Sequence, residues 1–178
     1  MGKPGFWVGF AAALAAAVWL ASPRTGSAAA ACEQVGVLVS AEGSVERQDA
    51  AGSWAPVAQG ATLCRADSLR TGKVSRAAVA LANDAVLRLD QDTTLKLEQV
   101  TADPGQRARI GLLAGALQSF SRKPHQVDVG TPFMNLAIRG TEFGVRVGAG
   151  ESVLSVQEGE VLASNATGEL AVPGGQSA

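Results

Sequence analysis

The side chains that could perform chemistry in this sequence are one histidine, a group of aspartates and two cysteines. His125 is the single histidine, so neither a histidine-rich metal site nor an H-E-x-x-H arrangement can be built. It follows Pro124, and we expect it to lie exposed in a polar turn. Cys32 and Cys64 are too few and too far apart for a structural zinc cluster.

Three aspartates, Asp84, Asp90 and Asp92, are close enough in the sequence to suggest a calcium site or a pair of carboxylates. The segment after Asp92 lacks the glycine that an EF-hand loop requires, so we expect these carboxylates to bind backbone amides of their own turns. The sequence has no G-x-S-x-G elbow and no G-x-x-x-x-G-K-[ST] loop. We therefore predict no catalytic residues, no metal site and no cofactor, and the chain is not expected to be an enzyme.

The first 31 residues are typical of a secretory signal peptide. Lys3 is basic, residues 6–21 form an uncharged apolar run, and residues 27–31 are small, as signal peptidase prefers. A helix over that run spans roughly 24 Å, less than the roughly 30 Å hydrocarbon core, so an uncleaved membrane anchor is the weaker alternative. We predict a helical signal peptide over 1–31 and a periplasmic domain over 32–178.

Both cysteines lie in the exported part of this prediction, where an even number favours a disulfide between Cys32 and Cys64. The closed loop of about 33 residues would contribute roughly 3.7 kcal/mol in the chain-entropy model. The alternative is a lipid anchor on Cys32. A lipobox normally adjoins the apolar run, whereas Ser22, Pro23 and eight further residues intervene here.

The charge of the predicted mature domain argues against a nucleic-acid partner. Removing 1–31 takes away two of the 15 basic residues and none of the 16 acidic ones, which leaves a net charge of −3. The densest basic pairs are Arg107 with Arg109 and Arg122 with Lys123, and aromatic residues for base stacking are scarce. No further apolar run is long enough to span a membrane.

After Cys32 the sequence consists of short apolar runs separated by Gly, Asp, Asn, Ser or Pro. In residues 94–98, leucines alternate with Lys96 and Glu98, the pattern of a strand with one wet face. No window has a helical period with caps. We predict a single all-β domain of many short strands, an irregular β-solenoid or a sandwich, and the spacing does not choose between them.

The most specific stretch is 127–147, where two alternating runs flank Thr131-Pro132 and Arg139-Gly140-Thr141, which we expect to be turns. Together with Phe143-Gly144-Val145, it resembles the T-P-x(5)-[VI]-R-G-T-x-F-x-V signature of the FecR family. The resemblance extends over most of residues 32–178, in order and spacing. Its motif residues, with a structural or interaction role, are Asp67, Thr71, Gly72, Thr131, Pro132, Arg139, Gly140, Thr141, Phe143, Glu158 and Gly159.

Two departures from the family pattern matter. Ala66 stands where the family usually has glycine before Asp67, which questions the geometry of that turn. Sensor members of the family also carry a cytoplasmic sigma-factor-binding segment before a membrane helix, and only five residues precede the apolar run here. The resemblance therefore implies a free-standing periplasmic FecR-type domain.

The expected function is a non-enzymatic protein-interaction module in envelope sensing or regulation, with an envelope protein as partner. The alternative is a module that binds cell-wall glycan or another envelope polymer. Within the motif, we expect Arg139 to be partly buried among apolar residues and paired with a carboxylate, either Asp67 or Glu158. The competing hypothesis is an exposed partner contact.

Overall fold

The structure, a computed structural model, describes residues 1–2, 32–49, 51–100, 103 and 106–178. Residues from Cys32 to Ala178 form one compact unit, and Met1–Ala31, which includes the predicted signal helix, lie mostly outside the described residues. The described part is built from strands without a helix, which confirms the all-β prediction. The strands are β1 (Gln34–Glu42), β2 (Val45–Gln48), β3 (Trp54–Pro56), β4 (Thr62–Cys64), β5 (Ser68–Thr71), β6 (Arg76–Leu81), β7 (Val86–Leu89), β8 (Thr94–Gln99), β9 (Ala108–Gly130), β10 (Asn135–Val147), β11 (Ser152–Asn165), β12 (Gly168–Pro173) and β13 (Gln176–Ser177).

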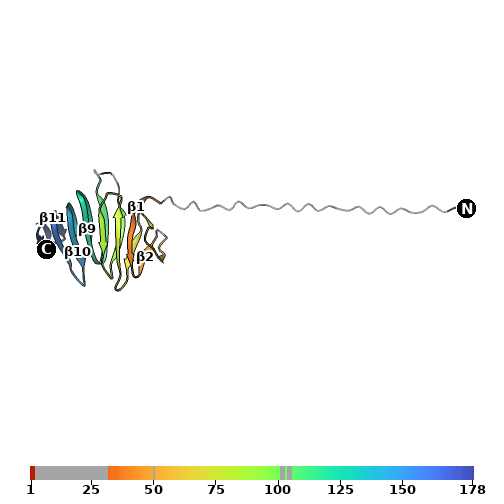
Figure 1. Cartoon of the computed structure of the whole chain (residues 1–178), viewed down its shortest axis with the longest axis horizontal. Coiled ribbons are helices and arrows are strands. Elements are labelled where there is room, and N and C mark those ends of the chain that lie inside the picture. Colours follow the sequence, from red (N-terminus) through yellow and green to blue (C-terminus); the bar gives the residue numbers. More distant parts are fainter. Residues whose placement is uncertain (3–31, 50, 101–102, 104–105) are drawn as a thin grey trace. The chain divides into compact units, whose positions relative to one another are not determined.

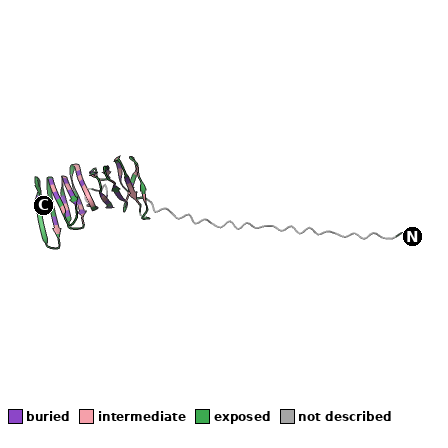
Figure 2. Cartoon of the chain, turned by 90° about the horizontal axis from the view of Figure 1, so that it is seen from below, coloured by how far each residue is buried: buried purple, intermediate pink, exposed green. Residues whose placement is uncertain are grey.

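The strands follow from apolar residues at every second position. In β8, Leu95 and Leu97 are fully buried while Lys96 and Glu98 are exposed. The same alternation appears as buried and exposed bands along the strands in Figure 2. Strands with this alternation have one face directed into the core and one directed to solvent.

One sheet runs through all the strands and doubles back at β9. Its path is β3-β2-β5-β8-β9-β7-β6-β1-β4, with β10 added to β9 and β11 to β10, as Figure 1 shows for the last three. Early in β9, Ile110 pairs with Leu97 of β8, and later Leu117 pairs with Leu89 of β7. The sheet therefore forms two layers that share strand β9.

A single apolar core lies between these layers. Leu69 and Leu95 enter it from the layer of β5 and β8, and Leu38, Val79 and Leu87 enter it from the layer of β1, β6 and β7. All five side chains are almost completely buried. Apolar burial on this scale supplies the main stabilising term of the fold.

The predicted turn at Arg139-Gly140-Thr141 is wrong, because β10 continues through these residues. β10 is paired on both sides, and a β-bulge between Gly140 and Glu142 accommodates the irregular residues. His125 was also expected in a turn and instead lies in β9, opposite Gly140. A bulge takes up an extra residue without ending a strand, so turn-like residue types need not mark a chain reversal.

Candidate functional site

Asp67 is buried in the turn between β4 and β5, with 2% of its surface exposed. Its carboxylate Oδ2 accepts a hydrogen bond from the backbone N of Cys64 at 2.8 Å, and Arg47 Nη1 lies 3.8 Å from the same oxygen. The preceding residue, Ala66, has a φ of 68°. The turn thus keeps the left-handed conformation that glycine favours, although alanine occupies the position.

The predicted disulfide is confirmed: Cys32 and Cys64 are bonded, with their Cα atoms 5.3 Å apart. Cys32 precedes β1 and Cys64 ends β4, which pairs with β1. The disulfide therefore fastens the start of the domain to the edge strand β4.

Thr71 and Gly72 lie where β5 ends beside the turn that precedes β8. The buried Thr71 hydroxyl donates to the carbonyl of Asp90 at 2.6 Å and accepts from the backbone N of Thr93 at 3.0 Å. The Gly72 amide donates to the Ser44 carbonyl at 2.9 Å, and a Cβ on Gly72 would lie 3.2 Å from the Ser44 Cβ. These two residues join three turns at one end of the sheet.

Thr131-Pro132 forms the predicted turn between β9 and β10. The Thr131 hydroxyl accepts from the backbone N of Met134 at 3.0 Å and donates to the Met134 carbonyl at 2.9 Å. It also accepts from the Ser152 hydroxyl at 2.9 Å, which links the turn to the start of β11. The exposed Pro132 lies within this turn. We therefore assign a structural role to Thr131.

Arg139 does not have the expected buried ion pair. Its side chain is exposed, and none of the ion pairs among the described residues includes it. Asp67 is close to Arg47 instead, and Glu158 is exposed on β11. Adjacent strand residues point to opposite faces, so the apolar Ile138 is directed inward and Arg139 outward.

The glycines of the motif bring two backbones together. Gly140 on β10 pairs with Gly159 on β11, and a Cβ on Gly159 would lie 2.4 Å from the Gly140 Cα. Gly159 also has a φ of 107°. Phe143 is buried in the core, and the side chain of Thr141 lies outside the described part. The bulge in β10 therefore depends on the absence of side chains at both glycines.

The aspartates lie in turns between strands. Asp84 and Asp92 have φ values of 66° and 53°, and the Asp90 carboxylate is 3.4 Å from Arg76 Nε. Within the described residues, no three His, Cys, Asp or Glu side chains are grouped to hold a metal ion. The side chain of His125 is not described.

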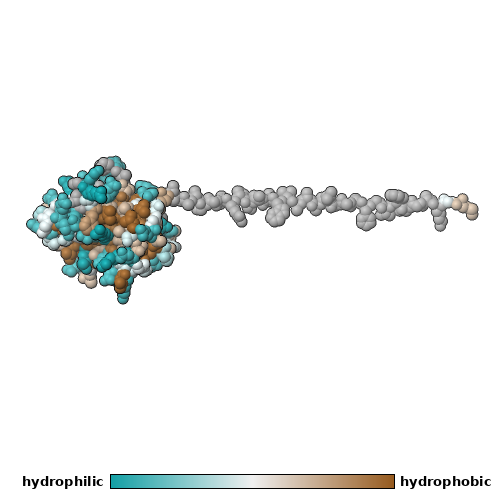
Figure 3. All heavy atoms as spheres, viewed as in Figure 1, coloured by the Kyte–Doolittle hydropathy of each residue, from teal (hydrophilic) through white to brown (hydrophobic). Residues whose placement is uncertain are grey.

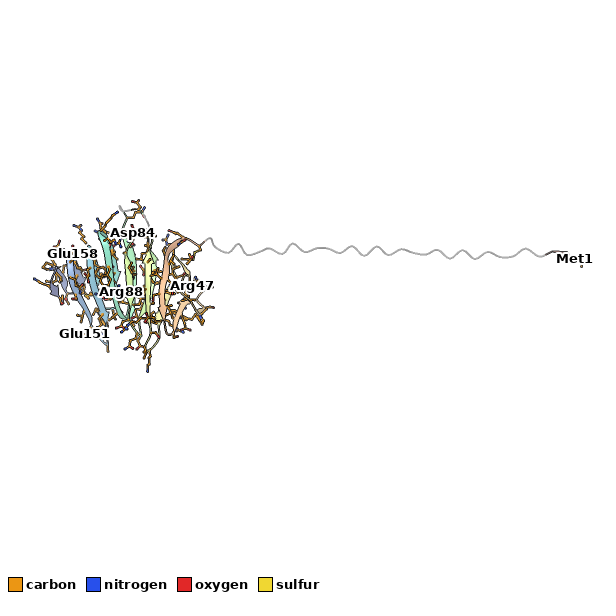
Figure 4. All side chains as sticks on the ribbon, in the orientation of Figure 1. Met1, Arg47, Asp84, Arg88, Glu151 and Glu158 are labelled. Atoms are coloured by element: carbon orange, nitrogen blue, oxygen red, sulfur yellow. A yellow bond between two sulfur atoms is a disulfide. The ribbon has the colours of Figure 1, made fainter. Side chains whose placement is uncertain are left out.

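A groove on the outward face of the sheet was missed by the sequence reasoning. It has a volume of about 550 Å³ and crosses β6, β7, β9, β10 and β11. Arg76, Arg88, Gln118, Gly144 and Arg146 are among its lining residues. Arg88 lies in the middle of the sheet in Figure 4. The outward positions of these arginines can be predicted from strand alternation, but their proximity depends on the pairing of β7 and β10 with β9.

Comparisons with known proteins identify the family. The sequence profile of the family described as FecR protein matches residues 67–162, which are 96 of the 178 residues. No curated protein sequence matches the chain. No helix in the described part could cross a membrane.

A solved structure similar to this chain is that of a protein provisionally assigned as an anti-sigma factor, from Parabacteroides distasonis. The TM-score is 0.54 at 14% sequence identity, and the match covers 62% of this chain and 52% of that one. The chain therefore spans about half the length of that protein, and at this identity the likeness concerns the fold. Because the family profile covers just over half of the sequence, the chain belongs to the FecR family.

Proposed function

We propose that this chain is a non-enzymatic, exported FecR-type domain that acts as a protein-interaction module in envelope sensing or regulation. Membership of the FecR family supports a regulatory role. The provisional name of the similar structure, an anti-sigma factor, denotes a protein that acts by binding another protein. The specific partner is an envelope protein in this proposal.

The observation that carries the proposal is how the motif residues are used. Asp67, Thr71 and Thr131 are engaged in contacts with backbone atoms, and Gly140 and Gly159 hold β10 against β11. Side chains occupied in this way build the fold, so these three motif residues are not free for acid–base or nucleophilic chemistry. The exposed faces of the sheet remain for binding.

Two aromatic rings are covered by arginine side chains, which favours binding of a protein over binding of a glycan. Sugar rings commonly stack on open aromatic faces, but the guanidinium of Arg70 covers Trp54 at 4.3 Å and that of Arg88 covers Phe120 at 4.6 Å. Phe133 is 41% exposed in the turn before β10. Arginine and aromatic side chains together are characteristic of protein interfaces.

Export is supported by the disulfide, because such bonds persist in oxidising compartments. We expect the mature protein to begin within 28–32 and to be released with the periplasmic fraction. Intact-mass measurement of the protein from the envelope tests this directly. A full-length mass in the membrane pellet would contradict cleavage, and a diacylglycerol adduct on Cys32 would establish a lipid anchor instead.

The test of the proposed function is affinity capture from an envelope extract, run beside sedimentation with purified peptidoglycan sacculi. The full-length chain is expressed, and its folded, disulfide-bonded product is used as bait. We expect a distinct envelope protein in stoichiometric amount and no co-sedimentation with sacculi. Saturable binding to sacculi without a protein partner would favour the glycan-binding alternative and refute the proposal.

A further inference from the structure

The groove on the outward face lies across a row of paired residues. Arg88 of β7 pairs with Gln118 of β9, Gln118 pairs with Gly144 of β10, and Gly144 pairs with Ser155 of β11. Because paired residues on neighbouring strands project from the same face, these four lie side by side. Arg146, two residues after Gly144, projects from the same face and borders the groove.

The floor of the groove is open because Gly144 has no side chain. Gly144 does not have a positive φ, and a Cβ built on it would meet only the Leu117 carbonyl oxygen, at 3.8 Å. The backbone therefore does not require glycine at this position, unlike at Gly159. Ala116, another small lining residue, is paired with Arg146 on the adjacent strand. Small residues between long arginines produce the hollow.

The groove carries more positive than negative charge. Arg76, Arg88 and Arg146 line it together with one carboxylate, Asp90, which is paired with Arg76 at 3.4 Å. Arg88 is held over the ring of Phe120, and the side chain of Arg146 makes no hydrogen bond or ion pair with another described residue. The chain as a whole has a net charge of −1, so the groove differs in sign from the whole chain.

We propose that this groove binds an extended acidic segment of a partner protein, whose carboxylates pair with Arg88 and Arg146. Guanidinium groups form bidentate, charge-assisted hydrogen bonds with carboxylates. The groove spans four inter-strand spacings of about 4.8 Å, roughly 19 Å, which accommodates five or six extended residues. This inference rests on the proposed protein-binding function and names its surface and the chemistry of its partner.

A protein segment fits the surroundings better than an anionic polymer. The same face of the sheet carries a neighbouring row of half-buried apolar residues, in which Val37 pairs with Ala80 and Ala80 with Val86. Figure 3 shows an apolar area with hydrophilic residues around it on the face of this domain turned to the viewer. An apolar row beside the arginines of the groove suits a peptide with aliphatic and acidic side chains.

The test uses a fluorescein-labelled hexaglutamate peptide and fluorescence anisotropy at low ionic strength, with the folded full-length chain as receptor. Two variants alter the groove: Arg146→Gln removes a charge and Gly144→Gln fills the floor. The matched control is Arg109→Gln, which removes an exposed arginine of β9 that does not line the groove. Thermal denaturation of each variant shows that it is folded.

We expect saturable binding whose Kd rises about tenfold in Arg146→Gln, the effect of losing a charge-assisted hydrogen bond. The Kd should rise by a similar factor in Gly144→Gln, because the new side chain occupies the floor of the groove, and should stay within about twofold in Arg109→Gln. Equal weakening in all three variants would overturn the inference, because the attraction would then be diffuse. Tighter, groove-dependent binding of oligogalacturonate than of hexaglutamate would overturn the assignment to a protein segment.

Failure of this inference can be separated from failure of the proposed function. If wild type and the two groove variants capture the same envelope protein equally, the groove is not the binding surface and the proposed function stands. If wild type captures no protein, the proposed function fails, whatever the affinity for hexaglutamate. Capture by wild type and Arg109→Gln, with loss in Arg146→Gln and Gly144→Gln, supports both.

Discussion

Ala66 has a backbone conformation that normally favours glycine, although it carries a Cβ. With a φ of 68° it occupies the left-handed region, where a Cβ costs roughly 1–2 kcal/mol. The turn tolerates this because Asp67 anchors it through the Cys64 amide and because the Ala66 amide donates to the Leu97 carbonyl at 2.8 Å. The position is therefore a small reservoir of strain beside a family motif.

Ala66→Gly should increase the free energy of unfolding by roughly 0.5–1 kcal/mol, since the relief of strain exceeds the greater flexibility of glycine in the unfolded chain. Urea denaturation measures the change. Ala78→Gly, within β6 and without a positive φ, is the control and should be destabilised by roughly 0.5–1 kcal/mol. Equal destabilisation of both variants would show that Ala66 is not strained.

The Thr71 hydroxyl stabilises the turn before β8 through two hydrogen bonds to its backbone. Thr71→Val preserves shape but leaves the Thr93 amide without its acceptor and the Asp90 carbonyl without its donor. We expect a loss of roughly 1–3 kcal/mol in the free energy of unfolding, measured by urea denaturation. Thr94→Val, a half-buried neighbour in β8, should change it by less than about 0.5 kcal/mol. A similar, small effect in both would contradict this role.

At the scale of elements, the pairing of β10 with β11 requires glycine at Gly140 but not at Gly144. Gly140→Ala places a Cβ about 2.5 Å from the Glu158 carbonyl oxygen, so β10 and β11 must separate locally. We predict a loss of roughly 2–3 kcal/mol in the free energy of unfolding by chemical denaturation. Gly144→Ala, on the same strand, makes only an ordinary van der Waals contact with the Leu117 carbonyl oxygen, at 3.8 Å, and should be neutral or stabilising. Reversed effects would refute the close approach at the bulge.

Structural features that depend on neighbouring residues in the sequence can be predicted, whereas those that depend on distant residues cannot. Alternation in β8, with Leu95 and Leu97 inward, identifies a strand from six residues. The pairing of β9 with both β7 and β8 joins residues distant in sequence, and no local pattern encodes it. The predicted burial of Arg139 is wrong because its apolar neighbours in the sequence project from the opposite face of the strand and do not surround its side chain.

Part of the candidate site can be predicted from the sequence and part cannot, for the same reason. The motif residues were identified in sequence from order and spacing, and the structure places Asp67, Thr71 and Thr131 in backbone contacts. The groove was not predicted, because Arg88 and Arg146 come together only through β9. A binding surface spread over five strands is a property of the sheet rather than of any segment.

At the scale of the whole molecule, the disulfide holds the beginning of the domain to an edge strand. The sheet path ends at β4, which among the described strands pairs with β1 alone. The Cys32–Cys64 bond therefore adds a covalent link to the pairing of β4 with β1. Replacing both cysteines by serine should lower the free energy of unfolding by roughly 3–4 kcal/mol, since a loop of about 33 residues becomes unconstrained. Urea denaturation of wild type with and without reductant checks the same quantity. An unchanged midpoint in both comparisons would show that the bond is dispensable.

The central claim is that this domain binds an envelope protein through the outward face of its sheet. The most direct measurement is photo-crosslinking in the native cell, with benzoylphenylalanine in place of Gln118 in the groove or of Thr167 in the turn between β11 and β12. We predict a discrete protein adduct from position 118, none from position 167, and loss of the adduct when Arg146→Gln is added. No protein adduct from position 118, or the same adduct from both positions, would contradict the claim.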